Sequence, residues 1–395
     1  MKRLQIGEFN DSFPPTIDGV AQVVKNYATH LQTHCDVTVA TPAYRGVVDD
    51  YPFDVVRYPS IPMEKQLGYR AGNPFAPDVL HTLRKKKFDI IHVHAPFASS
   101  VLARNVNLFR KTPLVLTYHT KYEQDIQKRV SLRGMQKIAL RFVLENINVA
   151  DEVWCVTEGC GQALREIGYE GTYTVMENGT DFPRGTADPA LVDALREKYD
   201  VRPNEFVFLY VGRMMWYKNV QLSLDALRLA KEQGLAFKFF LVGSGTDMDE
   251  MQQYVADIGL SEEVIFTGPV YDREELRVFY GLADLFLFPS TFDTCGIVVK
   301  EAAACDCPSL LIRNSCAAER AVHNVSGFLT EENAFSCSRT ILAACNDRRQ
   351  LKEVGKTAGK DLYLSWETAV ARAYRRYEQI LETWPGPLPY NSKNR

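Results

Sequence analysis

Two acidic residues in the second half of the sequence, Asp293 and Glu301, are separated by seven residues that include Gly296 and open an alanine-rich helical pattern. An ionised carboxylate only accepts hydrogen bonds, so such a pair suits a ligand rich in hydroxyl groups. The backbone N–H groups of Gly296, Ile297 and Val298, at the start of the predicted helix, could bind phosphate or sugar oxygens. A helix cap with nearby surface charge is the alternative explanation for an isolated pair of this kind.

Two basic residues, Arg213 and Lys218, follow a predicted strand at 206–211 and precede a predicted helix. Arginine binds phosphate oxygens with a fork of donors and lysine binds them as a point charge, so the two suit a diphosphate beside a helix N-terminus. Solvated loop charges are the alternative. The turn at Gly243 lacks the third glycine of a dinucleotide fingerprint, so it is either a plain turn or a close approach to a nucleotide.

Three histidines lie at the ends of two predicted strands in the first half. His92 and His94 belong to the strand at 89–94, and we expect their side chains on opposite faces, which would prevent a shared metal site. No metal site is therefore expected at these histidines, and none is expected at the diphosphate, because Arg213, Lys218 and helix N-termini can offset its charge. His119 follows the strand at 114–118, a position where a lone histidine is commonly a hydrogen-bonded structural residue.

The elements that position these residues alternate along the whole chain: short apolar runs and longer helical patterns, as in parallel sheets with crossover helices. With 395 residues, 46% of them hydrophobic, the chain can form two such α/β domains. Strands are expected at 4–9, 37–41, 89–94, 114–118, 152–156 and 172–176, then at 206–211, 238–242, 264–266, 285–288 and 309–312. The residues singled out above follow the carboxyl ends of strands, where open parallel sheets bind ligands.

Composition excludes some classes of function. The chain has 46 basic and 49 acidic residues and a net charge of -3, which argues against binding nucleic acid through bulk charge. Its nine cysteines lack a C-x-x-C pair and are expected to be reduced. No apolar run approaches the roughly 18 residues of a membrane span, and the first residues alternate like a strand rather than a signal peptide. We expect a cytoplasmic protein, with peripheral contact to the inner face of the membrane as an option.

A basic stripe favours that option. Arg129, Arg133, Lys137 and Arg141 are spaced by four residues within 126–144, a stretch without acidic residues. On a single helix they would share one side, with apolar residues on another, and this pattern suits an anionic membrane surface. An ordinary solvated helix packed on the core is the alternative.

The run Pro289-Ser290-x-x-Asp293-x-x-Gly296-x-x-x-x-Glu301-Ala302 resembles the paired-carboxylate motif of the family four retaining glycosyltransferases, which have the GT-B fold. The segments 212–219 and 266–284 resemble the diphosphate-binding and nucleotide-side segments of the same family. The first acidic residue of the motif is usually Glu. Asp293 departs from the pattern by one methylene, which leaves the choice of donor sugar open.

The resemblance implies two Rossmann-like, doubly wound domains facing a central cleft. We expect an acceptor-side domain at 1–182, with a last helix at about 366–395 packing back on it, and a nucleotide-sugar domain at 200–365. Three prolines between 181 and 204 are consistent with a connection there.

The resemblance also implies roles for individual residues. The matching histidine contacts the donor sugar, so His119, Asp293 and Glu301 are the expected catalytic residues, with His94 beside His119. Gly19 lies in a Pro/Gly loop like the one beneath the donor diphosphate. Donor binding is expected at Gly19, Arg213, Lys218, Gly243, Val270, Gly296, Ile297, Val298 and Glu301. On the acceptor or membrane side we expect His94, Tyr122, Arg129, Arg133, Lys137 and Arg141.

The implied reaction moves a hexose, from UDP-glucose or UDP-galactose, to a hydroxyl group with retention of anomeric configuration and without a cofactor. The segment 117–122 most resembles members that glycosylate diacylglycerol-type lipids. Three alternatives stay open: a saccharide acceptor in cell-surface polysaccharide synthesis, a sugar-nucleotide epimerase of the same fold, and a binding protein without catalysis.

Overall fold

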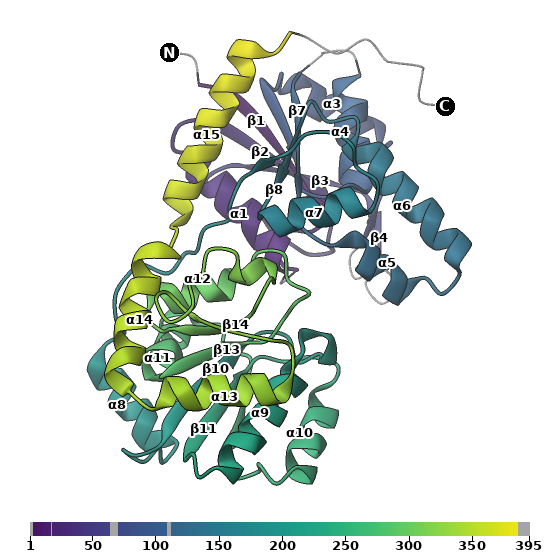
Figure 1. Ribbon diagram of the computed structural model, residues 1–395. Helices are drawn as coiled ribbons and strands as arrows, with labels where there is room; N and C mark the ends of the chain where they lie inside the picture. Colours follow the sequence, from purple (N-terminus) through teal and green to yellow (C-terminus); the bar gives the residue numbers. More distant parts are fainter. Residues whose placement is uncertain (1–2, 17, 64–69, 109–111, 386–395) are drawn as a thin grey trace. The chain divides into compact units, whose positions relative to one another are not determined.

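The computed structural model describes residues 3–16, 18–63, 70–108 and 112–385, which divide into two compact units. Unit 1 contains the described residues up to Asn178 together with those from Trp366 onward, and unit 2 runs from Gly179 to Ser365. Each unit has its own parallel sheet with helices packed against it (Figure 1).

The sheet of unit 1 has seven parallel strands in the order β3-β2-β1-β6-β7-β8-β9. They are β1 (Gln5–Phe9), β2 (Asp36–Pro42), β3 (Asp54–Tyr58), β6 (Ile90–Val93), β7 (Leu114–Tyr118), β8 (Glu152–Cys155) and β9 (Thr174–Val175). The order reverses between β1 and β6, and such a switch point is where doubly wound sheets bind ligands. The edge strand β3 was not predicted, because Asp54 and Arg57 interrupt its apolar pattern.

The helices of unit 1 are α1 (Gly19–Leu31), α3 (Pro77–Lys85), α4 (Ala98–Asn107), α5 (Tyr122–Arg129), α6 (Arg133–Ile147), α7 (Glu158–Glu166) and α15 (Trp366–Thr383), and a small antiparallel pair joins β4 (Ser60–Ile61) to β5 (Ala71–Gly72). The last helix, α15, packs on α1 (Figure 1). It buries Trp366 and Tyr377 completely or nearly so. The core of unit 1 is therefore closed by the end of the chain.

The sheet of unit 2 has six parallel strands in the order β12-β11-β10-β13-β14-β15. They are β10 (Phe206–Val211), β11 (Phe237–Val242), β12 (Val264–Gly268), β13 (Leu285–Phe288), β14 (Ser309–Ile312) and β15 (Phe328–Thr330). Here the switch point lies between β10 and β13. Only the short β15 was not predicted from the sequence.

Helices cover both faces of this second sheet. They are α8 (Pro189–Lys198), α9 (Val220–Glu232), α10 (Met248–Asp257), α11 (Arg273–Leu282), α12 (Ile297–Ala304), α13 (Ala334–Cys345) and α14 (Arg348–Asp361). Successive residues of β10 alternate between two cores: Val207 and Leu209 join α8, α11 and α12, whereas Phe208 and Tyr210 join α9, α10 and α13. This two-sided burial is why the strands of this sheet read as continuous apolar runs.

Candidate functional site

A buried lysine lies after β10, at the switch point of the sheet in unit 2. The chain leaves β10 at Val211, forms a 3-10 turn from Trp216 to Lys218, and enters α9 through Asn219. Asn219 has a φ of 63°, a left-handed conformation that asparagine tolerates better than most residues. Its side-chain amide donates a hydrogen bond to the carbonyl oxygen of Pro289 at 3.2 Å, which joins this loop to the one after β13.

Lys218 and Asp293 form the central contact between these two loops. Lys218 is only 8% exposed, and its Nζ lies 2.5 Å from Oδ1 of Asp293 and 5.4 Å from the ring centres of both Tyr217 and Phe292. The other carboxylate oxygen, Oδ2 of Asp293, is buried and accepts no hydrogen bond from any residue that the structure describes. A buried acceptor in this state is costly unless a ligand supplies a donor. Arg213 is exposed, with its guanidinium 5.9 Å from the ring centre of Tyr217.

Glu301, in the second turn of α12, has its own cation. Nη2 of Arg273 lies 2.7 Å from Oε1 of Glu301 and also pairs with Asp181, while the hydroxyl of Tyr280 donates to Oε2 of Glu301 at 3.1 Å. Burial raises the pKa of Glu301, and the charge on Arg273 opposes that rise. Arg273 and Asp181 were missed in the sequence, because no local pattern connects them to a carboxylate far along the chain.

The turn before α12 is built around a glycine. Gly296 caps the helix with φ 59° and ψ 58°, and a Cβ there would lie 3.1 Å from the Cβ of Ala317. Glycine is therefore favoured both by conformation and by space. The first N–H groups of a helix have no partner within it, so Gly296, Ile297 and Val298 offer donors to an anion or a sugar oxygen.

The other glycines differ in what surrounds them. Gly243 has a φ of 142°, and a Cβ there would lie 1.9 Å from the carbonyl oxygen of Gly212, so chain packing alone demands glycine. Val270, just after β12, packs against the core of unit 2. Gly19, at the start of α1, is exposed, and a Cβ built on it would meet nothing within 4 Å.

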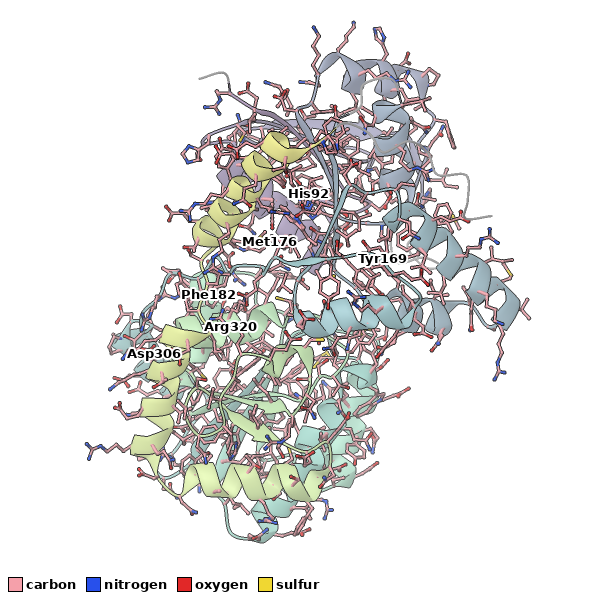
Figure 2. All side chains as sticks on the ribbon, turned by 45° about the horizontal axis from the view of Figure 1, so that its top comes forward. His92, Tyr169, Met176, Phe182, Asp306 and Arg320 are labelled. Carbon is pink, nitrogen blue, oxygen red and sulfur yellow. The ribbon has the colours of Figure 1, made fainter. Side chains whose placement is uncertain are left out.

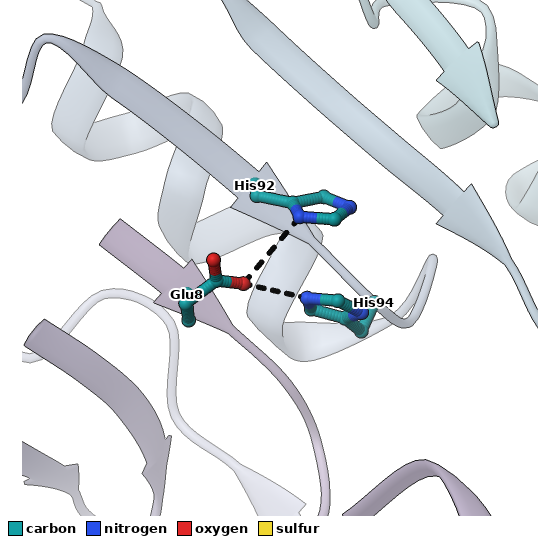
Figure 3. Close-up of side chains that lie close together, drawn as sticks. All are labelled: Glu8, His92 and His94. Atoms are coloured by element: carbon teal, nitrogen blue, oxygen red, sulfur yellow. Dashed lines mark hydrogen bonds and ion pairs between the residues drawn. The ribbon is translucent and has the colours of Figure 1, made fainter. Parts of the chain in front are cut away.

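His92 and His94 share one face of the sheet in unit 1, so the expectation of opposite faces is wrong. Residues two apart in an extended strand point to the same side. Their ring centres are 4.0 Å apart, and Oε2 of Glu8 lies 3.5 Å from Nδ1 of His92 and 2.6 Å from Nε2 of His94 (Figure 3). One ligand atom from each residue lies within 4.8 Å of the others, a spacing that could hold a metal ion. The geometric reason for excluding a metal here no longer stands.

His119 follows β7 and joins this cluster. Its Nε2 lies 3.0 Å from Nδ1 of His94, and the two rings are stacked with centres 5.2 Å apart. Burial lowers the pKa of His92, His94 and His119, that of His94 to about 3, and raises the pKa of Glu8 well above its ordinary value. Figure 2 labels His92 within this buried region. Glu8 was missed because a lone acidic residue inside a predicted strand carries no motif.

Tyr122 begins α5, and its ring is buried rather than presented to solvent. It lies edge-on to Phe97 and Tyr118, with ring centres 5.2 Å and 5.3 Å away. This packing indicates that Tyr122 anchors α5 to β7.

The single basic helix expected across 126–144 is two helices, α5 and α6, so the continuous stripe is wrong. Val130 and Leu132 have extended backbones, with ψ of 110° and 115°. β-branched valine followed by Ser131 favours helix weakly, which suits a break at this point. Arg129 is the last residue of α5, and its side chain lies outside the described residues.

The surface of α6 carries both basic and apolar side chains. Arg133, Lys137 and Arg141 are exposed, and so are four large apolar residues: Leu132, Met135, Ile138 and Phe142. Ile138, 70% exposed, is the extreme case. The helix packs inward through Val143, Asn146 and Ile147 instead. The alternative of an apolar side packed on the core is therefore wrong for these four residues.

Comparison with known proteins places both units in one family. The family model described as "Glycosyltransferase Family 4" matches residues 17–184, and the one described as "Glycosyl transferases group 1" matches residues 192–361. The alpha-monoglucosyldiacylglycerol synthase of Streptococcus pneumoniae is 26% identical over 318 residues, covering 77% of this chain and 70% of that protein. The GDP-mannose-dependent alpha-mannosyltransferase of Corynebacterium glutamicum is 24% identical over 395 residues, covering 96% and 90%.

Among solved structures, Anabaena Alr3699/HepE in complex with UDP has the same fold, with a TM-score of 0.78 at 21% identity, covering 95% of this chain and all of that one. Across the described part of this chain, no helix combines the length and the apolar character needed to cross a membrane. The two matched models, in order along one chain, and two doubly wound sheets with matching strand orders lead to one conclusion. The chain belongs to the family four, group 1 glycosyltransferases and is an enzyme of the GT-B type.

Proposed function

We propose that this enzyme transfers a hexose from a UDP-hexose, with UDP-glucose and UDP-galactose the leading donors, to the hydroxyl of a diacylglycerol-type lipid. The observation that carries the donor half is the Lys218–Asp293 pair at the switch point of unit 2, with Oδ2 of Asp293 buried and unpartnered. A sugar hydroxyl would satisfy that oxygen, and discrimination by buried hydrogen bonds of this kind is strong.

The diphosphate would bind beside the same pair. Lys218 and Arg213 supply positive charge, and the start of α12 supplies the N–H groups of Gly296, Ile297 and Val298. Fixed charges and dipoles aimed at the leaving phosphate stabilise the negative charge that develops there. We assign Glu301, already ordered by Arg273, to the donor's hydroxyl groups, and His119 to the donor sugar by family resemblance.

The reaction follows from that family. The bond between the anomeric carbon and the β-phosphate oxygen breaks, and a bond from the same carbon to the acceptor oxygen forms on the same face. Because departure and attack use the same face, the anomeric configuration is retained, and the acceptor's hydroxyl proton passes to the departing phosphate. Lys218 and Arg213 would lower the barrier by stabilising the diphosphate as it leaves.

The acceptor half rests on α6 and on a relative. An exposed helix with apolar residues next to basic ones suits the surface of an anionic membrane, which is where a diacylglycerol-type acceptor resides. The Streptococcus pneumoniae relative is named for making alpha-monoglucosyldiacylglycerol. On this basis we propose that the enzyme acts peripherally, on the cytoplasmic face of the cell membrane.

A GDP-mannose donor is the second candidate, because a relative that matches 96% of this chain is named as GDP-mannose-dependent. A saccharide acceptor stays the alternative to a lipid. Both choices concern specificity within one reaction class, and one experiment addresses them together.

The experiment is a donor and acceptor matrix followed by mass spectrometry. UDP-glucose, UDP-galactose and GDP-mannose are each incubated with diacylglycerol in anionic vesicles or with soluble oligosaccharides, using Lys218→Ala as the inactive control. We expect a hexosyl-lipid from one UDP-hexose only. Product from GDP-mannose or on a saccharide alone would replace the proposal with the corresponding alternative. An epimerised UDP-sugar without transfer would identify an epimerase, and donor binding without any product a binding protein.

A further inference from the structure

His119 adjoins a cluster of buried polar side chains that the family motifs do not include. Glu8, His92 and His94 are fully buried, and His119 is nearly so. Oε2 of Glu8 lies 2.6 Å from Nε2 of His94, and Nδ1 of His94 lies 3.0 Å from Nε2 of His119. Each contact is of hydrogen-bond length, so three residues from β1 and the ends of β6 and β7 form one connected chain.

His92 stands beside this chain, held by other partners. Its Nδ1 lies 2.6 Å from the hydroxyl of Tyr377, on α15, and its Nε2 lies 2.6 Å from the hydroxyl of Thr117. The hydroxyl of Tyr377 also donates to Oε1 of Glu8 at 3.5 Å. Both nitrogens of His92 and both of His94 thus meet protein partners. A metal ion would have to displace these bonds, so hydrogen bonding accounts for the cluster better than a metal site does.

The connectivity restricts where the protons can be. A neutral imidazole has one donor nitrogen and one acceptor nitrogen, so the role of one nitrogen fixes the role of the other. If Glu8 donates its proton to Nε2 of His94, then Nδ1 of His94 must donate to Nε2 of His119. The proton of His119 is then on Nδ1. The opposite order, with Glu8 ionised, would put it on Nε2.

Burial decides between the two orders. A lone carboxylate in a region without exposed atoms is expensive, and burial lowers the pKa of the neighbouring histidines, which disfavours a compensating positive charge on them. Among the described side chains, no lysine or arginine forms an ion pair with Glu8. The arrangement that buries no charged group has Glu8 protonated and the histidines neutral, in agreement with the strong upward shift of the Glu8 pKa.

We propose that Glu8 and His94 are positioning residues for His119: Glu8 donates to His94, His94 donates to His119, and Nδ1 of His119 carries a proton for the donor sugar. The proposal rests on the proposed role of His119 at the donor. In this proposal, Glu8 and His94 set the orientation and the tautomer of the His119 ring. Only His119 contacts the substrate. Tyr377 makes the C-terminal helix part of the same arrangement, since its hydroxyl reaches both His92 and Glu8.

The test combines imidazole nitrogen NMR with kinetics on the full chain. The chain has seven histidines, so ¹⁵N-histidine labelling gives few signals, which His94→Gln and His119→Gln variants assign. Without substrate, we expect the wild type to show His94 and His119 as neutral Nδ1–H tautomers. A proton on Nε2 of His119, or a charged His119 ring at neutral pH, would overturn the proposal.

Two variants at position 8 separate positioning from folding. Glu8→Gln keeps an N–H donor towards His94, so the tautomers of His94 and His119 should be those of the wild type. The kcat should stay within about threefold of the wild-type value. Glu8→Met removes the donor at similar size. We expect it to shift the His119 signals and to lower kcat on the order of 100-fold, with little change in KM for the UDP-sugar.

Unchanged His119 signals in folded Glu8→Met, or full turnover despite shifted signals, would contradict the proposal. So would a stoichiometric zinc content in the wild type that Glu8→Met loses. Failure of the proposed function looks different: the wild type would then show the expected tautomers but transfer no hexose. Should Glu8→Met not fold, the wild-type tautomers alone still decide.

Discussion

The side chain of Lys218 contributes both to the proposed donor binding and to the stability of the fold. Lys218 neutralises a half-buried carboxylate, and removing it leaves Asp293 with neither oxygen paired. We expect Lys218→Ala to abolish turnover and to lower the free energy of unfolding by about 1–3 kcal/mol, with the protein still folded. Adding Asp293→Asn should recover part of that stability but no activity. Urea unfolding and hexosyl transfer measure the two effects.

Lys231→Ala is the matched control, because this lysine lies in the last turn of α9, the helix that follows Lys218, and contacts Glu263 and the carbonyl oxygen of Gly259 at the surface. It should leave turnover unchanged. Glu301→Ala should also abolish turnover, since it removes the partner of Arg273 and Tyr280. Near-normal activity in Lys218→Ala or Glu301→Ala would remove the basis for the donor site.

Asp293 is one methylene shorter than the glutamate that the family usually has here. Its Oδ1 is held by Lys218, so its distance from a bound sugar is set by the loop rather than by a flexible arm. We expect Asp293→Glu to change the preference between UDP-glucose and UDP-galactose, measured as the ratio of kcat/KM values, by about tenfold. An unchanged ratio would show that position 293 does not select the sugar.

Sequence reasoning found the residues of unit 2 that belong to motifs and missed those that do not. Asp293, Glu301 and Lys218 stand in short, ordered segments after strands, so their types and spacing could be read directly. Arg273, Asp181 and Glu8 contribute through tertiary contacts only, and isolated charges look like solvated ones. His92 and His94 were visible, but their relation was inferred wrongly because the two-residue period of a strand was misapplied.

At the scale of elements, glycines in the turns after strands fall into two kinds. Some are required by chain packing, and others would be required only by a bound ligand. Gly243→Ala would bring a Cβ within 1.9 Å of a carbonyl oxygen at a positive φ. We expect a loss of about 2–3 kcal/mol in unfolding free energy. Gly19→Ala adds a methyl group in open space, so stability should stay within about 0.5 kcal/mol, while KM for the donor rises if the diphosphate lies over this turn.

Urea unfolding and donor kinetics on both variants decide the matter. Unimpaired stability in Gly243→Ala would mean that the β11 turn adapts, contrary to its close approach to Gly212. An unchanged KM in Gly19→Ala would argue that the diphosphate does not lie over the start of α1.

The helix α6 makes the membrane proposal testable in two independent parts. Changing Arg133, Lys137 and Arg141 to Gln should weaken binding to anionic vesicles by about 1 kcal/mol per residue, and the effect should vanish at high salt. Changing Met135, Ile138 and Phe142 to Ser should weaken binding to any vesicle. Co-sedimentation at several ionic strengths measures both.

A matched control comes from α14, where Arg349, Lys352 and Lys356 are also exposed, on a helix without a large exposed apolar strip. Their change to Gln should leave vesicle binding unchanged. Equal losses from α6 and α14 would indicate unspecific attraction between charges, and no loss from either would remove α6 as the membrane contact.

The elements themselves were the most predictable part of the molecule. The strands at 114–118, 206–211, 285–288 and 309–312 have the predicted bounds, because burial on both faces makes a strand apolar throughout. The edge strand β3 and the break between α5 and α6 were not predicted. The strand β3 depends on what packs against it, as the exposed apolar residues of α6 also do, whereas the break lies at Val130 and Ser131, which favour helix weakly.

At the scale of the whole molecule, the chain completes unit 1 only after it has built unit 2, since α15 returns to pack on α1. Trp366 and Tyr377 are buried in unit 1, and the Tyr377 ring stacks on Trp154 with centres 5.3 Å apart. Ending the chain at Ser365 should therefore destabilise unit 1 and leave unit 2 intact. Calorimetry should show one transition lost or lowered and the other kept.

UDP identifies which transition belongs to which unit. If the donor site lies in unit 2, UDP at 100 times its Kd should stabilise only that transition, by about 2.7 kcal/mol, in the full chain and in the truncated one alike. Tyr377→Phe is the control for the helix, because it removes the hydroxyl bonds to His92 and Glu8 but keeps the buried ring. It should lower the unfolding free energy of unit 1 by about 1–3 kcal/mol for the lost bonds, clearly less than the truncation does, and leave the unit 2 transition unchanged. Loss of both transitions on truncation would mean that unit 2 depends on α15, and UDP stabilisation of the unit 1 transition would place the nucleotide elsewhere.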